Sequence, residues 1–178
     1  MKILIISLSN LGDAILTYPA LQALWTAYPN AEYHVLAPEN ARGLFEGDPR
    51  FHMVWKWERD ASFLLHLILI VRLAGIGFDL AVDFRNSIIP FFLPGVRRTP
   101  FLRRTPPRLH RVEQHLSLLE RLGIPRVEAP SPLPFSSQEQ QRISQWVEEG
   151  KRVVVMAPGA RSDLKRWDPR RFAAVADR

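Results

Sequence analysis

The sequence predicts an α/β fold built on a Rossmann-like, doubly wound parallel sheet. Along the first half of the chain, short apolar runs rich in β-branched residues alternate with helical patterns, and the connections between them are short. Strands and helices that alternate in this way typically form a parallel sheet with helices on its faces. Hydrophobic residues make up 47% and charged residues 24% of the 178 residues, which is ordinary for a packed soluble domain.

Each element of the first half has a local signal. Residues 2–7 form a continuous apolar run, typical of a strand buried on both faces, and a polar turn at 9–13 follows it. A helical pattern covers 14–28, where Pro19 predicts a kink or marks the true first turn. Gly-containing turns close the later elements. Further strands are expected at 33–37, 51–57 and 78–83, and further helices at 38–45 and 60–74.

The middle of the chain is less regular. Residues 94–112 hold six arginines, four prolines and no acid, which predicts loops. An amphipathic pattern at 110–122 predicts a helix with Gly123 as its C-cap. The proline-rich segment 124–135 is typical of an extended linker, and the capping box from Ser136 to Glu139 opens a polar helix that should reach residue 149.

The last segment resembles the opening of a second α/β unit. A second buried-type strand is expected at 153–157, a Gly turn follows it, and Asp168 with Pro169 predicts a helix start. One strand with one helix cannot form an independent sheet. We therefore expect two domains, residues 1–135 and residues 136–178, the second being the truncated beginning of a further domain.

Composition excludes several kinds of site. The chain has no cysteine, which excludes disulfides, thiolate metal sites and cysteine nucleophiles. The five histidines lack the spacing of a metal site, and most are expected to be structural. The N-terminal apolar run is too short for an export signal. The most apolar stretch, 63–71, is shorter than the roughly 20 residues of a membrane span and fits a buried or interfacial helix. These features predict a cytoplasmic protein.

Four segments, in order, resemble the lipopolysaccharide heptosyltransferases, glycosyltransferase family 9. The N-terminal strand and turn through Asp13, with Thr17–Leu21 after them, resemble the family's amino terminus, and residues 157–172 resemble the opening of its donor domain. Residues 78–83 and 110–124 resemble family segments between these two. The resemblance spans nearly the whole chain, although the family's later donor-binding motifs fall beyond Arg178.

The resemblance implies the first half of a two-domain GT-B glycosyltransferase, with an acceptor-binding domain at 1–135 and the start of a donor domain at 136–178. It implies inverting, metal-independent transfer of heptose from ADP-heptose to the Kdo/heptose inner core of lipopolysaccharide, without a cofactor. The implied partners are ADP-heptose, the anionic lipid A–core acceptor and, peripherally, the inner membrane surface. This chain alone is expected to be inactive.

Asp13 is the candidate general base. It follows the first strand at its carboxyl end, where open α/β sheets bind ligands. An inverting transfer needs one carboxylate to take the proton of the attacking hydroxyl, and the family's base matches Asp13. The alternative is a structural role, in which Asp13 caps free N–H groups and stabilises the helix dipole.

The donor phosphates are expected at the second Gly turn. Backbone N–H groups at Gly159 and Ala160, with the Lys165 ammonium, could hold a diphosphate and stabilise a leaving ADP without a metal. The family's residue at the position of Lys165 contacts donor phosphate. Without the resemblance, Lys165 and Arg166 would be read as solvated loop charges.

The acceptor is expected to contact the first Gly turn and the arginine-rich segment. Arginine forks suit the carboxylates and phosphates of an anionic acceptor, although a solvated basic loop is the alternative. Asp83, with 85–87 beyond it, either borders the acceptor site or caps the strand end. The predicted acceptor contacts are Ser9, Asn10, Gly12, Arg97, Arg98, Arg103 and Arg104.

Two other functions compete with the enzyme as interpretations of this sequence. A non-catalytic α/β binding or interaction module could keep the same acceptor-domain fold. Nucleic-acid binding is disfavoured because the arginine segment lacks a series of stacking aromatic residues and any known nucleic-acid motif.

Overall fold

The structure is a computed structural model that describes residues 1–101, 109–127, 133, 135, 137–147, 150–160 and 162–177. The chain divides into two compact units, Met1–Phe135 and Ser136–Arg178. The predicted Arg103 and Arg104 lie outside the described residues. The division of roles between an acceptor and a donor domain stays a prediction.

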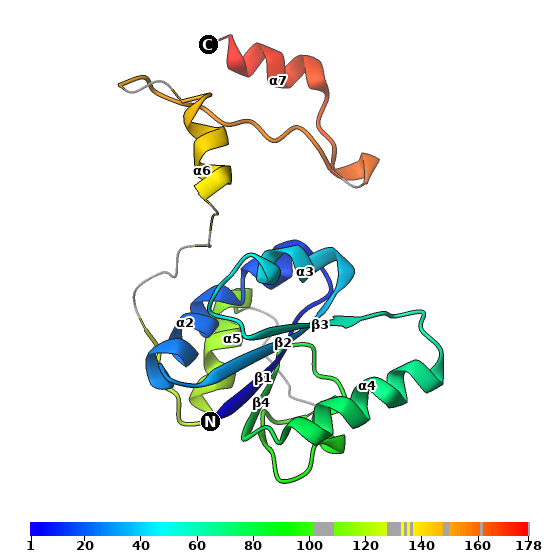
Figure 1. Cartoon of the computed structure of the whole chain (residues 1–178). Coiled ribbons are helices and arrows are strands. Elements are labelled where there is room, and N and C mark those ends of the chain that lie inside the picture. The colour runs from blue at the N-terminus through cyan, green and yellow to red at the C-terminus, as the bar shows by residue number, and fades with distance from the viewer. Residues whose placement is uncertain are drawn as a thin grey trace. The chain divides into compact units, whose positions relative to one another are not determined.

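The first unit is built on a parallel five-stranded sheet, so the predicted fold class is confirmed (Figure 1). The strand order is β3-β2-β1-β4-β5, and all four neighbouring pairs are parallel. From central β1 the chain builds outward through β2 and β3, then returns to the other side of β1 for β4 and β5. The strands are β1 (Lys2–Ile6), β2 (Glu32–Pro38), β3 (Met53–Trp57), β4 (Leu80–Asp83) and β5 (Arg97–Arg98).

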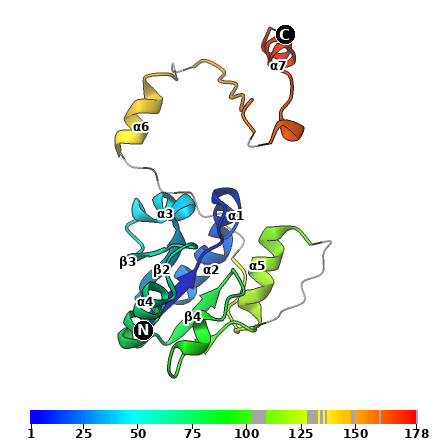
Figure 2. The same cartoon turned by 90° about the vertical axis from the view of Figure 1, so that its right-hand side faces the viewer.

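Helices cover both faces of this sheet, as Figure 2 shows for α5 on one side and α4 on the other. Because successive side chains of β1 point to opposite faces of the sheet, this strand contributes to two separate cores. Ile3 and Ile5 face a core shared with α2, α3 and α5, whereas Leu4 and Ile6 face a core shared with α4 and η1. The helical elements are α1 (Leu11–Ile15), α2 (Tyr18–Ala27), α3 (Glu39–Glu46), α4 (Phe63–Ile76), η1 (Ile89–Phe92) and α5 (Arg111–Glu120).

Local signals explain where these helices begin and end. The predicted helix at 14–28 is divided into α1 and α2, with Pro19 in the first turn of α2, as its fixed φ requires. Ser62 caps α4 by accepting the Leu65 N–H, and Gly77 ends it at φ 72°. α5 ends at Glu120 with Arg121 as its C-cap, so Gly123, the predicted C-cap, lies two residues further on, at φ 72°.

The second unit contains α6 (Ser137–Ser144), η2 (Asp163–Lys165) and α7 (Pro169–Ala176). Asp168 caps α7 as predicted, accepting the Arg170 N–H at 2.8 Å. The strand expected at 153–157 is wrong, because these residues have no regular structure and Val155 is 87% exposed. A strand needs a neighbouring strand for its hydrogen bonds, and the described residues of this unit supply none.

α6 ends at Ser144, so the predicted polar helix is shorter than residues 136–149. Its exposed face has no packing partner among the described residues, and helices this short are marginal without tertiary contacts. None of the described helices combines the length and the apolar character needed to cross a bilayer.

Candidate active site

A cavity of about 230 Å³ opens at the carboxyl ends of β1 and β4. These neighbouring strands mark the point where the sheet's order reverses, which is where open α/β sheets bind ligands. Its lining comes from the turn after β1, the turn after β4 and the first half of α5, and comprises Leu8, Asp13, Phe84, Arg85, Asn86, Arg111, Gln114 and His115. The predicted base therefore lies in a cavity with two arginines.

Asp13 occupies the first turn of α1 and is half-buried. Its Oδ2 accepts a hydrogen bond from Asn10 Nδ2 at 3.1 Å. Asn10 is the N-cap residue of α1, and its side chain makes no cap hydrogen bond. The Asp13 carboxylate is thus oriented by a neighbouring amide while it lines a cavity, an arrangement suited to accepting a proton from a bound hydroxyl.

The other residues predicted in the first Gly turn are Ser9, Asn10 and Gly12, which all precede Asp13 in the sequence. Ser9 and Asn10 precede α1, and neither lines the cavity. Gly12 lies within α1 without a positive φ, and a Cβ there would meet nothing within 4 Å. The backbone conformation therefore does not require a glycine at this position. Contact of Gly12 with an acceptor stays a prediction.

Asp83 organises the turn that carries Arg85 into the cavity. The buried carboxylate accepts the Arg85 N–H at 2.8 Å, the Ser87 N–H at 2.6 Å and the Ser87 hydroxyl at 2.8 Å. Asn86 in this turn has φ 62°, a left-handed conformation that asparagine tolerates better than most residues. The capping alternative for Asp83 is therefore confirmed, and its place beside an acceptor site stays a prediction.

Arg85 is the cation supplied by this turn. Burial lowers the pKa of its guanidinium, and the charge of Arg59 lowers it further. Its Cζ lies 5.4 Å from the centroid of the Trp57 ring, so the side chain also packs against the end of β3. Because the Arg85 guanidinium is partly desolvated, an anionic ligand in the cavity would stabilise its positive charge.

The start of α5 supplies the opposite wall. His110 Nδ1 accepts the Val112 N–H at 3.3 Å and caps the helix. Arg111 Nη1 donates to Gln114 Oε1 at 3.1 Å, which orients the second arginine of the cavity. His115 is buried and packs edge-to-face on Phe84 with 5.2 Å between ring centroids.

Sequence reasoning did not select Arg85, Arg111 or Gln114 as site residues. Arg111 was counted only within the arginine-rich segment, and its place at the N-terminus of a predicted helix was the available signal. Arg85 follows a predicted strand by two residues, so its position after a carboxyl end was a signal of the same kind.

The predicted acceptor arginines on β5 lie elsewhere. Arg97 donates to the Leu122 carbonyl, and the Arg98 guanidinium lies 4.3 Å from the centroid of the Phe91 ring. Neither residue lines the cavity that contains Asp13. The structure therefore brings Asp13 together with Arg85 and Arg111, and it does not bring Arg97 or Arg98 to them.

The predicted phosphate contacts belong to the second unit. The Ala160 carbonyl accepts a hydrogen bond from Arg166 Nη2 at 2.9 Å, which joins the Gly turn to the end of η2. Gly159 has open space around its Cα, and Lys165 is exposed at the end of η2. Trp167 and Phe172 pack edge-to-face with 5.0 Å between their centroids, consistent with packing anchors.

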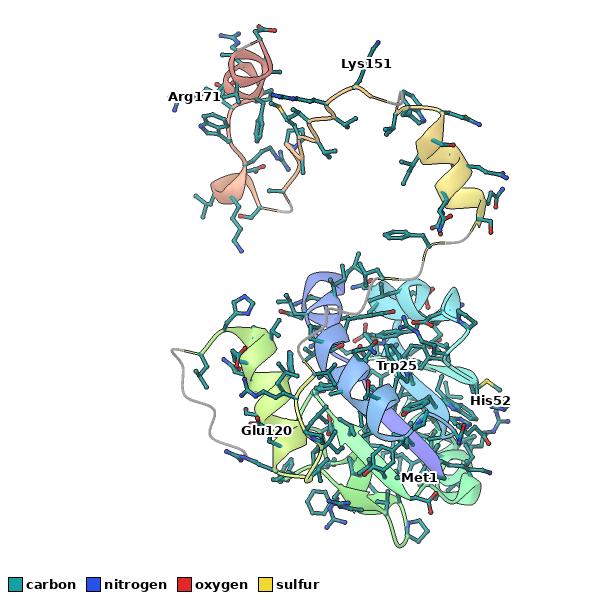
Figure 3. The ribbon with its side chains drawn as sticks, turned by 90° about the vertical axis from the view of Figure 1, so that its left-hand side faces the viewer. Met1, Trp25, His52, Glu120, Lys151 and Arg171 are labelled. Carbon is teal, nitrogen blue, oxygen red and sulfur yellow. The ribbon has the colours of Figure 1, made fainter. Side chains whose placement is uncertain are left out.

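Folding also assembles a cluster that sequence spacing did not reveal. Glu32, His34 and His52 each offer a possible metal-ligand atom, and these atoms lie within 4.8 Å of one another. His52 is the exposed member of this cluster and lies at the margin of the first unit (Figure 3). The three residues come together because β2 and β3 pair in parallel register, with His34 opposite Met53.

Hydrogen bonds at His34 argue against a metal there. Trp55 Nε1 donates to His34 Nδ1 at 3.1 Å, so the neutral ring carries its proton on Nε2. That nitrogen lies 2.7 Å from Glu32 Oε1 and donates to it, which leaves no lone pair for an ion. Desolvation lowers the pKa of His34 despite the adjacent carboxylate, which keeps the ring neutral.

Comparison with known proteins gives one consistent family. The sequence model described as "Glycosyltransferase family 9 (heptosyltransferase)" matches residues 70–178. Lipooligosaccharide heptosyltransferase 2 of Campylobacter jejuni is 29% identical over 99% of this chain and 56% of its own length. Lipopolysaccharide heptosyltransferase 3 of Escherichia coli is 24% identical over 93% of this chain and 57% of its own.

The solved structures agree. The structure of Escherichia coli ADP-heptose lps heptosyltransferase II superposes with a TM-score of 0.72 and 25% identity, covering 99% of this chain and 60% of that one. This chain thus spans a little over half the length of the curated relatives that it matches.

Proposed function

This chain belongs to glycosyltransferase family 9, the heptosyltransferases, and we propose that the protein containing it transfers heptose from ADP-heptose to an anionic inner-core acceptor of lipopolysaccharide. The observation that carries the proposal is the cavity at the β1/β4 switch point, where the Asp13 carboxylate lies with Arg85 and Arg111. The names of the relatives support heptose as the sugar transferred.

Asp13 acts as the general base. Its carboxylate takes the proton from the acceptor hydroxyl as that oxygen attacks the anomeric carbon, and the bond from that carbon to the ADP oxygen breaks on the opposite face. The single displacement inverts the anomeric configuration. The hydrogen bond from Asn10 holds one carboxylate oxygen, so the side chain is oriented before the acceptor binds.

The two arginines of the cavity recognise the acceptor. Arg85 is partly desolvated and Arg111 is oriented by Gln114, so each can pair with a carboxylate or phosphate at low cost in side-chain entropy. Arg97, Arg98, Arg103 and Arg104 remain predicted contacts with more distant anionic groups of the acceptor.

The donor is held by the second unit. Backbone N–H groups at Gly159 and Ala160, with the Lys165 ammonium, bind the diphosphate and neutralise charge as ADP leaves, so no metal is needed. We propose residues 1–135 as the acceptor domain and 136–178 as the start of the donor domain. The chain of 178 residues alone would lack most of that domain and would be inactive. The proposed location is the cytoplasm, with peripheral contact to the inner membrane.

The decisive test is Asp13→Asn in a form of the protein that carries a complete donor domain. Asparagine keeps the size and the hydrogen bond with Asn10 but is not basic. Single-turnover heptose transfer should slow by about 10²–10⁴, with the Kd for ADP-heptose unchanged. Lys165→Ala should instead weaken ADP-heptose binding.

Asp177→Asn at the end of α7 is the matched control, because it removes an equivalent carboxylate far from the first-unit cavity in sequence. It should leave transfer unchanged. If Asp13→Asn lowers the melting temperature but transfers heptose at the normal rate, Asp13 is a structural residue and the assignment of the base is wrong.

A further inference from the structure

Helix α4 is apolar apart from His66 and Arg72, yet only Leu73 of its 14 residues is buried. A helix that is hydrophobic all round normally lies in a protein core or in lipid. Its exposed large side chains are Phe63 (82%), Leu64 (62%), Leu65 (55%), Leu67 (44%), Ile68 (41%) and Val71 (62%). The sequence predicted a buried or interfacial helix, and burial within the described residues does not account for this one.

The exposed residues form a continuous stripe. Leu64, Leu67, Ile68 and Val71 follow the spacing i, i+3, i+4, i+7 of a single helix face, which we name the outer face. Leu73 packs in the opposite direction, toward Leu4 and Ile6 of the sheet. The outer face therefore points away from the core that α4 helps to form.

A neighbouring element extends this surface. η1 contacts α4, and both contribute buried residues to the same core. The exposed apolar side chains in and beside η1 are Ile88 (57%), Phe91 (47%) and Phe92 (53%). Two elements in contact thus expose more apolar side chains than the scattered singles that any protein surface shows, and we call these side chains the patch.

The charges around the patch are mainly positive. Neither α4 nor η1 contains an acid, Arg72 is exposed on α4, and Arg98 stacks on Phe91. The acids between residues 61 and 101 are Asp79, which accepts the Lys2 backbone N–H, and Asp83, which is buried in its turn. The segment just before α4 has no net charge, because Lys56 and Arg59 are matched by Glu58 and Asp60.

We propose that the first unit binds an anionic phospholipid bilayer through the outer face of α4 together with η1. Apolar side chains flanked by cations suit the boundary between headgroups and acyl chains, where the cations meet lipid phosphates. The proposal deepens the proposed function, because a lipid-linked acceptor is presented at such a surface.

The test is co-sedimentation of the 178-residue chain with phosphatidylcholine vesicles, with and without phosphatidylglycerol. Binding should be stronger to the vesicles that contain phosphatidylglycerol. The double variant Leu64→Gln, Val71→Gln should reduce vesicle partitioning by at least about tenfold. Each replacement removes the favourable free energy of moving an aliphatic side chain from water into the acyl-chain region. Glutamine is a good helix former, so the melting temperature should not change.

Met53→Gln is the matched control, since Met53 is an apolar side chain on edge strand β3 that is 45% exposed. It should bind vesicles like the unsubstituted chain. Equal vesicle binding by the double variant, or no binding by the unsubstituted chain, would overturn the proposal. So would a concentration-dependent dimer that the double variant abolishes, because a second copy would then cover the face.

The vesicle assay contains neither donor nor acceptor, so its outcome does not depend on heptose transfer. Transfer to a soluble, delipidated acceptor examines the proposed function separately, in a form of the protein that carries a complete donor domain, and the double variant of that form should retain transfer. If the double variant loses vesicle binding but still transfers heptose to the soluble acceptor, α4 is a membrane-binding surface and not part of the cavity.

Discussion

Replacing Asp83 by asparagine should destabilise the first unit and disturb the cavity at the same time. The buried carboxylate accepts three hydrogen bonds, two from backbone N–H groups and one from the Ser87 hydroxyl. Asparagine has one acceptor oxygen and one amide group, so either the Arg85 N–H or the Ser87 donors would face another donor. The turn that positions Arg85 would then lose its anchor.

The magnitude follows from these contacts. Losing one charge-assisted hydrogen bond costs about 1.5–3 kcal/mol, and a buried donor left without an acceptor adds about 1–3 kcal/mol. Together these two effects predict a decrease of about 2.5–6 kcal/mol in the free energy of unfolding. Ser87→Ala removes only the hydroxyl and keeps the backbone bond, so it should cost about 0.5–1.5 kcal/mol.

Urea unfolding followed by circular dichroism measures both variants against the unsubstituted chain. The expected order of stability is unsubstituted, then Ser87→Ala, then Asp83→Asn, with similar m-values. If Asp83→Asn were as stable as Ser87→Ala or more so, the carboxylate would not be the anchor of this turn, and the account of how Arg85 reaches the cavity would fail.

Two further predictions concern protonation and local order. Because burial lowers the pKa of His34 below its unfolded value of about 6.5, the unfolded chain takes up the proton more readily, and this site's contribution to stability is lost as pH falls below about 6.5. His34→Gln, which keeps an acceptor for Trp55, should flatten the decline of melting temperature between neutral and mildly acidic pH, and an equally steep decline would contradict the assignment. Amides of residues 153–157 should exchange with solvent much faster than those of β1, because they have no strand partner, and protection equal to that of β1 in mass-spectrometric exchange would show a strand there.

Much of the first unit could be predicted because its signals are local. The apolar run at 2–7, the proline at 19 and the glycines at 77 and 123 each specify a strand, a helix start or a helix end through backbone chemistry that the neighbouring residues do not override. The same local reading failed at 153–157, because a strand is completed by partners from elsewhere and β-branched composition alone does not provide them.

The candidate site was predictable only in part. Asp13 could be selected because it follows a strand at the end where such sheets bind ligands, and the family resemblance gave it a role. Arg85 and Arg111 had only weak local signals, since their meeting with Asp13 depends on β4 pairing beside β1 and on α5 packing over α2. Arg97 and Arg98 carried the strongest charge signal in the sequence, yet they lie on β5 and outside the cavity.

By itself, the sequence determined the α/β alternation, the absence of cysteine chemistry, the positive charge and the resemblance to a heptosyltransferase, because each is a property of composition or of short segments. Only the tertiary structure decided which charges share a cavity, which histidine nitrogen holds its proton and which helix face stays uncovered. Those three depend on contacts between residues far apart in the chain, such as Trp55 with His34 and η1 with α4. Side-chain chemistry is local, but the environment that gives it a function is made by packing.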